Sequence, residues 1–182
     1  MSNLDSIPIF LCLRIMLALI FLTAAVGKFR HLLAFKGVLD NYRLLPHWAL
    51  APAQLSIPAG EIAIAVGILC FPAPAATIGA ALLVVFAAAI AINLRRGRLQ
   101  IDCGCHQSAL RQRLSWTLIW RNGVLALLAL AASLPQPRAN LSSVLLGAAA
   151  GASLFFLYST MNSLWAVGPV LRRRIRIAGV RM

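Results

Sequence analysis

Residues 73–94 read APAATIGAALLVVFAAAIAINL and contain no charged side chain over 22 positions. A helix needs about 20 predominantly apolar residues to cross the hydrocarbon core of a bilayer. The stretch therefore predicts a transmembrane helix. Pro72 and Pro74 predict a tight hairpin between this helix and the apolar segment that precedes it.

Four further segments of the same character flank this stretch. The first of them lacks a basic start and is interrupted by Arg14, so we expect a retained helix and not a cleaved signal peptide. The sequence therefore predicts an all-α, polytopic membrane helix bundle with about five transmembrane helices. The predicted spans are about 7–27, 50–71, 73–94, 114–134 and 141–167, followed by a basic tail at 168–182.

The composition indicates a single integral membrane domain over residues 1–182. Apolar residues make up 61% of the chain, charged residues make up 12%, and the mean hydropathy is +0.86. Soluble domains have roughly 45–50% apolar and about 25% charged residues. The net charge of +13 does not indicate nucleic-acid binding, because the basic residues fall in short stretches between apolar runs. The predicted partner is therefore the lipid bilayer, with no nucleic acid.

Lysine and arginine are distributed unevenly about the predicted spans. With five spans, 14 of the 17 basic residues lie in connections or in the tail on one side, and only Arg138 lies in a connection on the other. Cytoplasmic loops of membrane proteins carry an excess of basic residues. We therefore expect a multi-pass protein of the bacterial inner membrane, with its N-terminus outside and its C-terminus in the cytoplasm.

The connection after the first span is amphipathic. Between Lys28 and Ala49, apolar residues such as Phe35 and Leu39 are interleaved with charged residues such as Lys36. This pattern is typical of a helix that lies in the membrane interface. We predict a short amphipathic surface helix after the first span, which either anchors the chain to lipid or covers the residues beside it.

The most informative motif is Ile101-Asp102-Cys103-Gly104-Cys105-His106, just before the fourth predicted span. Two thiols separated by one glycine can form a small disulfide ring, because glycine permits tight backbone turns. Such a ring departs from relaxed disulfide geometry and is reduced more easily. Neighbouring arginines and the start of the next helix favour the reactive thiolate. We predict a redox-active dithiol at Cys103 and Cys105, with Asp102 and His106 able to take up or deliver a proton.

Two other interpretations of this motif stay open. One is a metal site formed by Cys103, Cys105 and His106, since cysteine and histidine are common metal ligands. That set lacks a clear fourth ligand, and its spacing is tighter than that of usual zinc pairs. The cysteines can also be structural or incidental. Cys12 and Cys70, near the outer ends of their predicted spans, form either a second redox pair or only small side chains in apolar helices.

Three ionisable residues lie inside the predicted spans, namely Arg14, Glu61 and Arg121. Such residues are costly in a bilayer and usually face the protein interior. We predict an Arg14–Glu61–Arg121 cluster, which either holds the first, second and fourth spans together or forms a polar pocket for a quinone headgroup or a proton. A further pair, Gly147 and Gly151, is spaced for close helix packing within the chain or between copies.

Several motifs occur together along the first four predicted spans. The more specific ones are Asp102-Cys103-Gly104-Cys105 and the later Arg121-Asn122. The weaker ones are Gly27-Lys28-Phe29, Tyr42-Arg43-Leu44-Leu45-Pro46, Glu61 and Leu114-Ser115-Trp116. In these motifs the chain resembles the methylamine utilisation protein MauE family, within the broader MauE/DoxX group of redox-associated membrane proteins. Relatives often have an aromatic residue where this chain has His106.

The resemblance implies a role in making methylamine dehydrogenase, whose exported small β-subunit carries a tryptophan-derived quinone and many disulfides. Members of the family are thought to help process, transport or mature that subunit with a thioredoxin-like partner, MauD. We therefore expect a maturation factor that acts as a thiol–disulfide oxidoreductase through its dithiol. The charge bias places the dithiol at the cytoplasmic face, whereas a protein that forms disulfides in an exported subunit would be expected to present it to the periplasm. Either the dithiol exchanges with a cytoplasmic thioredoxin and sends electrons across the membrane, which the charge bias favours, or the positive-inside rule fails here.

Two alternative functions belong to other classes. One is a non-catalytic assembly or export factor that binds MauD or the β-subunit. The other is a quinone-linked membrane oxidoreductase centred on Glu61. Dithiol exchange itself requires no cofactor, whereas the second alternative requires a quinone.

Overall fold

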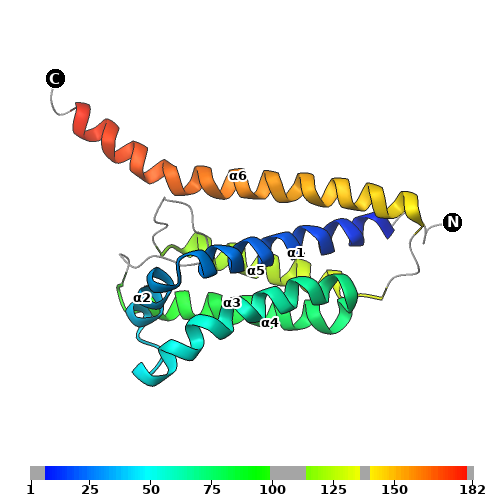
Figure 1. The fold of residues 1–182 in the computed structure, drawn as a ribbon. Helices are drawn as coiled ribbons and strands as arrows, with labels where there is room; N and C mark the ends of the chain where they lie inside the picture. The colour runs from blue at the N-terminus through cyan, green and yellow to red at the C-terminus, as the bar shows by residue number, and fades with distance from the viewer. Residues whose placement is uncertain (1–6, 99–113, 136–139, 180–182) are drawn as a thin grey trace.

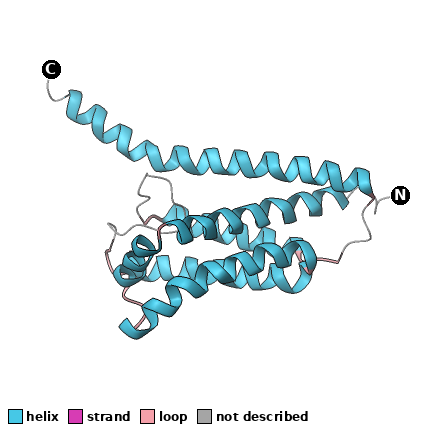
Figure 2. Cartoon of the chain, in the orientation of Figure 1, coloured by secondary structure: helices cyan, strands magenta, loops and turns pink. Residues whose placement is uncertain are grey.

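The computed structural model describes residues 7–98, 114–135 and 140–179, with side chains described from Pro8 to Trp165 within these ranges. The described residues form helices joined by loops, and no strand occurs among them (Figure 2). The prediction of an all-α bundle is confirmed. In chain order the helices are α1 (Ile7–Arg30), α2 (Leu32–Tyr42), α3 (His47–Cys70), α4 (Pro72–Arg95), α5 (Trp116–Ala132) and α6 (Leu141–Gly179) (Figure 1).

The helices have the length and surface of membrane-crossing elements. α1, α3, α4 and the first 25 residues of α6 are long and apolar enough to span a bilayer. α5 has 17 residues, at the lower limit of the range of roughly 17–25 residues for a transmembrane helix. Large apolar side chains such as Leu145 and Phe156 are exposed on the outside, where a soluble protein would rarely gather them. The chain is therefore a multi-pass membrane protein.

Successive long helices run in opposite directions, and α2 lies at one end of the bundle (Figure 1). We call this the α2 end, and the opposite end the far end. α1, α4 and α6 finish at the α2 end, and α3 and α5 begin there. Arg98 and Leu114, which flank residues 99–113, consequently both lie at the α2 end.

The helix ends differ from the predicted spans by a few residues, and one difference matters for the site. The sequence predicts that the first span ends near Gly27 and that Lys28 begins the surface connection. α1 instead continues to Arg30, because backbone hydrogen bonding does not stop at the first charged side chain. Lys28 therefore belongs to the last turn of α1 and not to the connection that follows it.

Close packing of large apolar side chains with alanines forms the centre of the bundle. Leu17 of α1, Ile68 of α3, Ala76 of α4 and Ala129 of α5 are fully buried in one core. α6 lies along α1 (Figure 1), where a Cβ atom added at Gly151 would lie 2.7 Å from the carbonyl oxygen of Cys12. The glycine pair of α6 therefore serves packing within the chain.

Candidate functional site

A buried ion pair joins α1 to α3. Lys28 Nζ lies 2.5 and 2.7 Å from the two carboxylate oxygens of Glu61. The side chains of Lys28 and Glu61 are only 4% and 2% exposed. An isolated charge in such a place is costly, whereas the two opposite charges compensate each other. The pair therefore forms a polar centre without net charge inside an apolar bundle.

This arrangement corrects the predicted cluster of Arg14, Glu61 and Arg121. Arg14 donates hydrogen bonds from Nε to Ala132 O (3.0 Å) and from Nη2 to Leu134 O (2.9 Å). It lies about four turns before Lys28 on α1, or about 21 Å along the axis, and is too distant to contact Glu61. The prediction that Arg14 neutralises Glu61 is therefore wrong. Arg14 instead satisfies carbonyl groups at the C-terminus of α5, where a cation is favoured.

Arg121 has a partner that the sequence did not predict. Its Nη1 donates a 2.9 Å hydrogen bond to Asn162 Oδ1, which links α5 to α6. Lys28 and Asn162 are thus the residues that sequence reasoning missed. A signal for Lys28 existed, because Glu61 is the one acidic residue in a predicted span and Lys28 adjoins the end of another.

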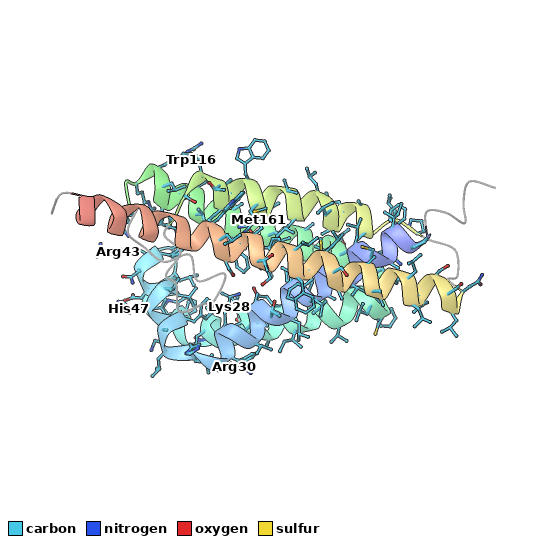
Figure 3. The ribbon with its side chains drawn as sticks, turned by 90° about the horizontal axis from the view of Figure 1, so that it is seen from above. Lys28, Arg30, Arg43, His47, Trp116 and Met161 are labelled. Atoms are coloured by element: carbon cyan, nitrogen blue, oxygen red, sulfur yellow. The ribbon has the colours of Figure 1, made fainter. Side chains whose placement is uncertain are left out.

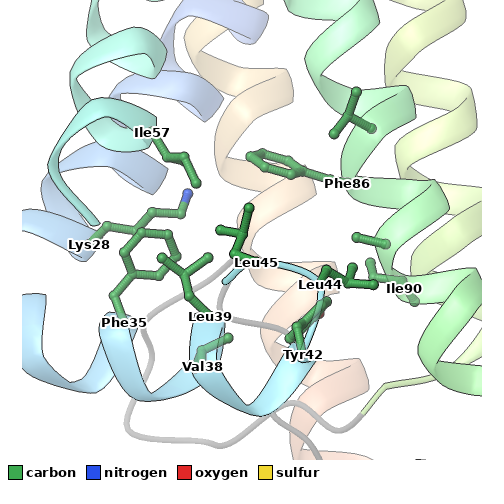
Figure 4. A pocket seen from close by; sticks show the side chains of 12 residues that line it. Lys28, Phe35, Val38, Leu39, Tyr42, Leu44, Leu45, Ile57, Phe86 and Ile90 are labelled. Carbon is green, nitrogen blue, oxygen red and sulfur yellow. The ribbon is translucent and has the colours of Figure 1, made fainter. Parts of the chain in front are cut away.

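An apolar cavity of about 230 Å³ lies beside the ion pair, between α2, the α2–α3 turn, α3 and α4 (Figure 4). We call it the α2 pocket. Lys28 Nζ lies 5.7 Å from the centre of the Phe35 ring and 5.6 Å from that of Phe86, within the range of cation–π contacts. α2 therefore covers residues of the bundle. The pocket is lined by Lys28, Phe35, Val38, Leu39, Tyr42, Leu44, Leu45, Ile57, Val85, Phe86, Ala89 and Ile90.

The predicted dithiol site, with Asp102, Cys103, Cys105 and His106, lies outside the described residues. Its flanks are described, and both are attached near α2. Arg98 Nη1 donates a 3.4 Å hydrogen bond to Asn41 O of α2. Leu114 is buried in a small core with Tyr42 of α2 and Leu94 of α4. Both flanks of the motif therefore lie at the α2 end.

The α2 end also carries exposed basic residues. Arg30, Arg43 and His47 lie there together, as the view from above shows (Figure 3). Arg95 and Arg96 at the end of α4 add further exposed positive charge. This concentration of basic residues is what the charge pattern of the sequence predicts for one face of the membrane protein.

Cys12 and Cys70 do not form a disulfide in the structure. Both thiols are free; Cys12 is buried and Cys70 is exposed. Among the described residues, no group of three or more His, Cys, Asp and Glu side chains is arranged to hold a metal ion. The metal interpretation of Cys103, Cys105 and His106 concerns residues outside that set.

Comparison with known proteins gives a consistent result over most of the chain. The family model described as "Methylamine utilisation protein MauE" matches residues 6–135. Proteins named "Methylamine utilization protein MauE" are 48% identical in Paracoccus denitrificans and 42% identical in Paracoccus versutus, each over 157 residues that cover 84% of both chains. The protein of that name from Methylorubrum extorquens is 45% identical over 152 residues, or 80% of this chain and 81% of the relative.

No solved structure matches this chain. The family match covers α1 to α5, together with the Cys-Gly-Cys motif and both residues of the buried ion pair. The chain therefore belongs to the methylamine utilisation protein MauE family.

Proposed function

We propose that this protein supports maturation of the methylamine dehydrogenase β-subunit by thiol–disulfide exchange at Cys103 and Cys105. The observation that carries the proposal is the Cys-Gly-Cys motif in a chain of the MauE family. The described structure adds support, because both flanks of the motif are held at the basic α2 end of the bundle. A dithiol tethered there can meet a water-soluble partner while the helices remain in the bilayer.

The chemistry requires only that the pair alternate between a disulfide and two thiols. A partner thiolate attacks the Cys103–Cys105 disulfide and forms a mixed disulfide, which the partner's second thiol resolves. The partner dithiol loses two electrons and two protons, and the pair gains them. The reverse sequence reduces the partner. Asp102 and His106 exchange the protons, and arginines near the motif favour the reactive thiolate form.

The partners that fit this chemistry are a thioredoxin-like protein similar to MauD and, through it, the β-subunit. The exposed arginines at the α2 end support a cytoplasmic location for that end. On this basis the protein resides in the bacterial inner membrane with its C-terminus in the cytoplasm. Two electrons then have to cross the membrane to connect the dithiol with an exported subunit.

The test replaces each cysteine separately and measures mature β-subunit. Cys103→Ser and Cys105→Ser should each reduce the amount of fully disulfide-bonded β-subunit at least about tenfold, because serine cannot form a mixed disulfide. Intact-mass analysis of the purified β-subunit under non-reducing conditions counts its disulfides. Immunoblotting of membrane fractions checks that each variant is still inserted.

The matched control is Cys70→Ser, which removes an exposed, free thiol near the far end of the bundle. This variant should leave maturation unchanged. Normal maturation in both motif variants would contradict thiol exchange and would favour a non-catalytic assembly or export factor instead.

A further inference from the structure

The α2 pocket combines an apolar wall with a buried hydrogen-bond donor, the ammonium group of Lys28. A lysine ammonium group has three N–H donors, and two of those of Lys28 face the oxygens of Glu61. No further hydrogen bond of Lys28 Nζ is present among the described residues. Since Lys28 lines the pocket, its third N–H can serve a ligand held there (Figure 4).

The charge of the site selects the type of acceptor. Because Glu61 already compensates Lys28, an anionic ligand would add an uncompensated charge inside the bundle. A neutral carbonyl oxygen would accept the remaining hydrogen bond without that cost. The rings of Phe35 and Phe86 flank the ammonium group and offer apolar contact to a flat ring.

The size and opening of the pocket further restrict the ligand. An apolar cavity of about 150 Å³ holds benzene, and sites for whole drug-sized molecules occupy about 300–1,000 Å³. The α2 pocket, at about 230 Å³, therefore suits one substituted ring. Its lining includes Leu44, Leu45 and Val85, which are exposed on the outside of the bundle, so a long apolar tail can leave toward lipid.

We propose that the α2 pocket binds the ring of a lipophilic membrane quinone, with one carbonyl accepting a hydrogen bond from Lys28 and the tail in the bilayer. The choice of a redox-active carbonyl compound rests on the proposed thiol chemistry, whereas the pocket, the donor and the lipid-facing opening do not. This assignment differs from the predicted quinone site of Arg14, Glu61 and Arg121. Of that set only Glu61 takes part, by holding Lys28 in place.

The quinone completes the electron balance of the dithiol. Two thiols and one quinone give one disulfide and one quinol, with transfer of two electrons and two protons. The quinol then carries the electrons away within the membrane. The α2 pocket and the flanks of the dithiol motif lie at the same end of the bundle, which favours direct exchange between the dithiol and the quinone.

Binding of decylubiquinone to the purified full-length protein in detergent tests the proposal. Ala89→Phe should fill the pocket and weaken binding at least about tenfold, since overpacking of a cavity costs about 1–3 kcal/mol. Val85→Trp should also weaken quinone binding, because it closes the lipid-facing opening of the pocket. This variant provides the test if Ala89→Phe fails to fold. Isothermal titration calorimetry gives the dissociation constants.

The controls are Ala88→Phe and Val84→Trp, whose positions are exposed, adjoin the test positions on α4 and do not line the pocket. Both should bind the quinone within about twofold of the unchanged protein. Equal affinity in the pocket variants and their controls would overturn the proposal. So would equally effective binding of a saturated fatty acid, which would identify a lipid-chain site.

The same titration with Cys103 and Cys105 both changed to serine separates this inference from the proposed function. Quinone binding should persist in that protein, because the proposed donor Lys28 and the apolar wall around it are supplied by described residues of α1 to α4. Loss of maturation with intact quinone binding is the expected result. Loss of maturation with no quinone binding, in this protein and in the unchanged one, would overturn the quinone site alone.

Discussion

At the scale of single residues, the Lys28–Glu61 pair is the decisive feature of the bundle interior. Burying either charge alone inside the bundle would cost much free energy. Together the two charges form a neutral pair, whose burial costs far less. The pair fixes α1 against α3 where the α2 pocket begins. It thereby gives an ordered polar donor to a mostly apolar cavity.

Replacing one residue of the Lys28–Glu61 pair should reveal the free-energy cost of a single buried charge. Glu61→Leu or Lys28→Met alone should lower the free energy of unfolding by about 3–5 kcal/mol, because one buried charge is left uncompensated. The double variant should recover most of that loss, since two apolar side chains replace the pair. Denaturant titration of the detergent-solubilised protein measures all three. A single variant as stable as the unchanged protein would show that the pair is not coupled.

Sequence patterns identified Glu61 as important but paired it with Arg14 and did not pair it with Lys28. Hydropathy marks a span as finished at the first charge, so Lys28 was predicted outside α1 although the helix continues to Arg30. The sequence predicts that Arg14 pairs with the carboxylate of Glu61, whereas it donates hydrogen bonds to the carbonyl groups of Ala132 and Leu134. These carbonyl groups are available to Arg14 only because α5 ends beside it. The sequence around Arg14 does not encode where α5 ends.

At the scale of the elements, the contact between α1 and α6 depends on two glycines. The missing side chains at Gly147 and Gly151 let α6 approach Leu11 and Cys12 of α1. The spacing of the glycines predicted close packing, but it could not distinguish another copy of the chain from α1. That choice depends on which helix the fold brings alongside.

Gly151→Leu should therefore push α6 away from α1. An added Cβ would meet backbone oxygen, which cannot rotate aside, so we expect a loss of roughly 2 kcal/mol or more in the free energy of unfolding. Gly123→Ala is the matched control, because nothing lies within 4 Å of its added Cβ. That change should stabilise α5 slightly, by up to about 1 kcal/mol. Equal stability of the two variants would contradict the packing contact.

The short helix α2 shows a second limit of local patterns. Its amphipathic sequence predicted a surface helix, and the structure has one at Leu32–Tyr42. Its role as the cover of a cavity was only one of two alternatives. The cavity lies where side chains of α2, α3 and α4 face one another, and that arrangement involves residues about 50 positions apart, such as Phe35 and Phe86.

At the scale of the whole molecule, the alternating helices bring three features to one end. These are the exposed arginines, the α2 pocket and the flanks of the Cys-Gly-Cys motif. Hydropathy and charge counting were sufficient to predict the helical membrane class, because both are properties of composition along the chain. The placement of the pocket and of the motif's flanks at the same end was not predictable, since it follows from three-dimensional packing.

The proposed function makes the dithiol a participant in electron transfer at this end. Such a pair must be reactive in the living cell and must change its oxidation state when its partner does. It must also be accessible from one side of the membrane only. All three properties concern Cys103 and Cys105, and one labelling experiment addresses them together.

The most direct test is thiol labelling of intact cells with a membrane-impermeant reagent and, separately, with a permeant one, on a variant in which Cys12 and Cys70 are serine. We predict that only the permeant reagent labels Cys103 and Cys105, and that deletion of the thioredoxin-like partner shifts their ratio of thiol to disulfide. Mass spectrometry of the labelled peptide reads both results. If the ratio of thiol to disulfide at Cys103 and Cys105 does not change when the thioredoxin-like partner is deleted, the result contradicts thiol exchange.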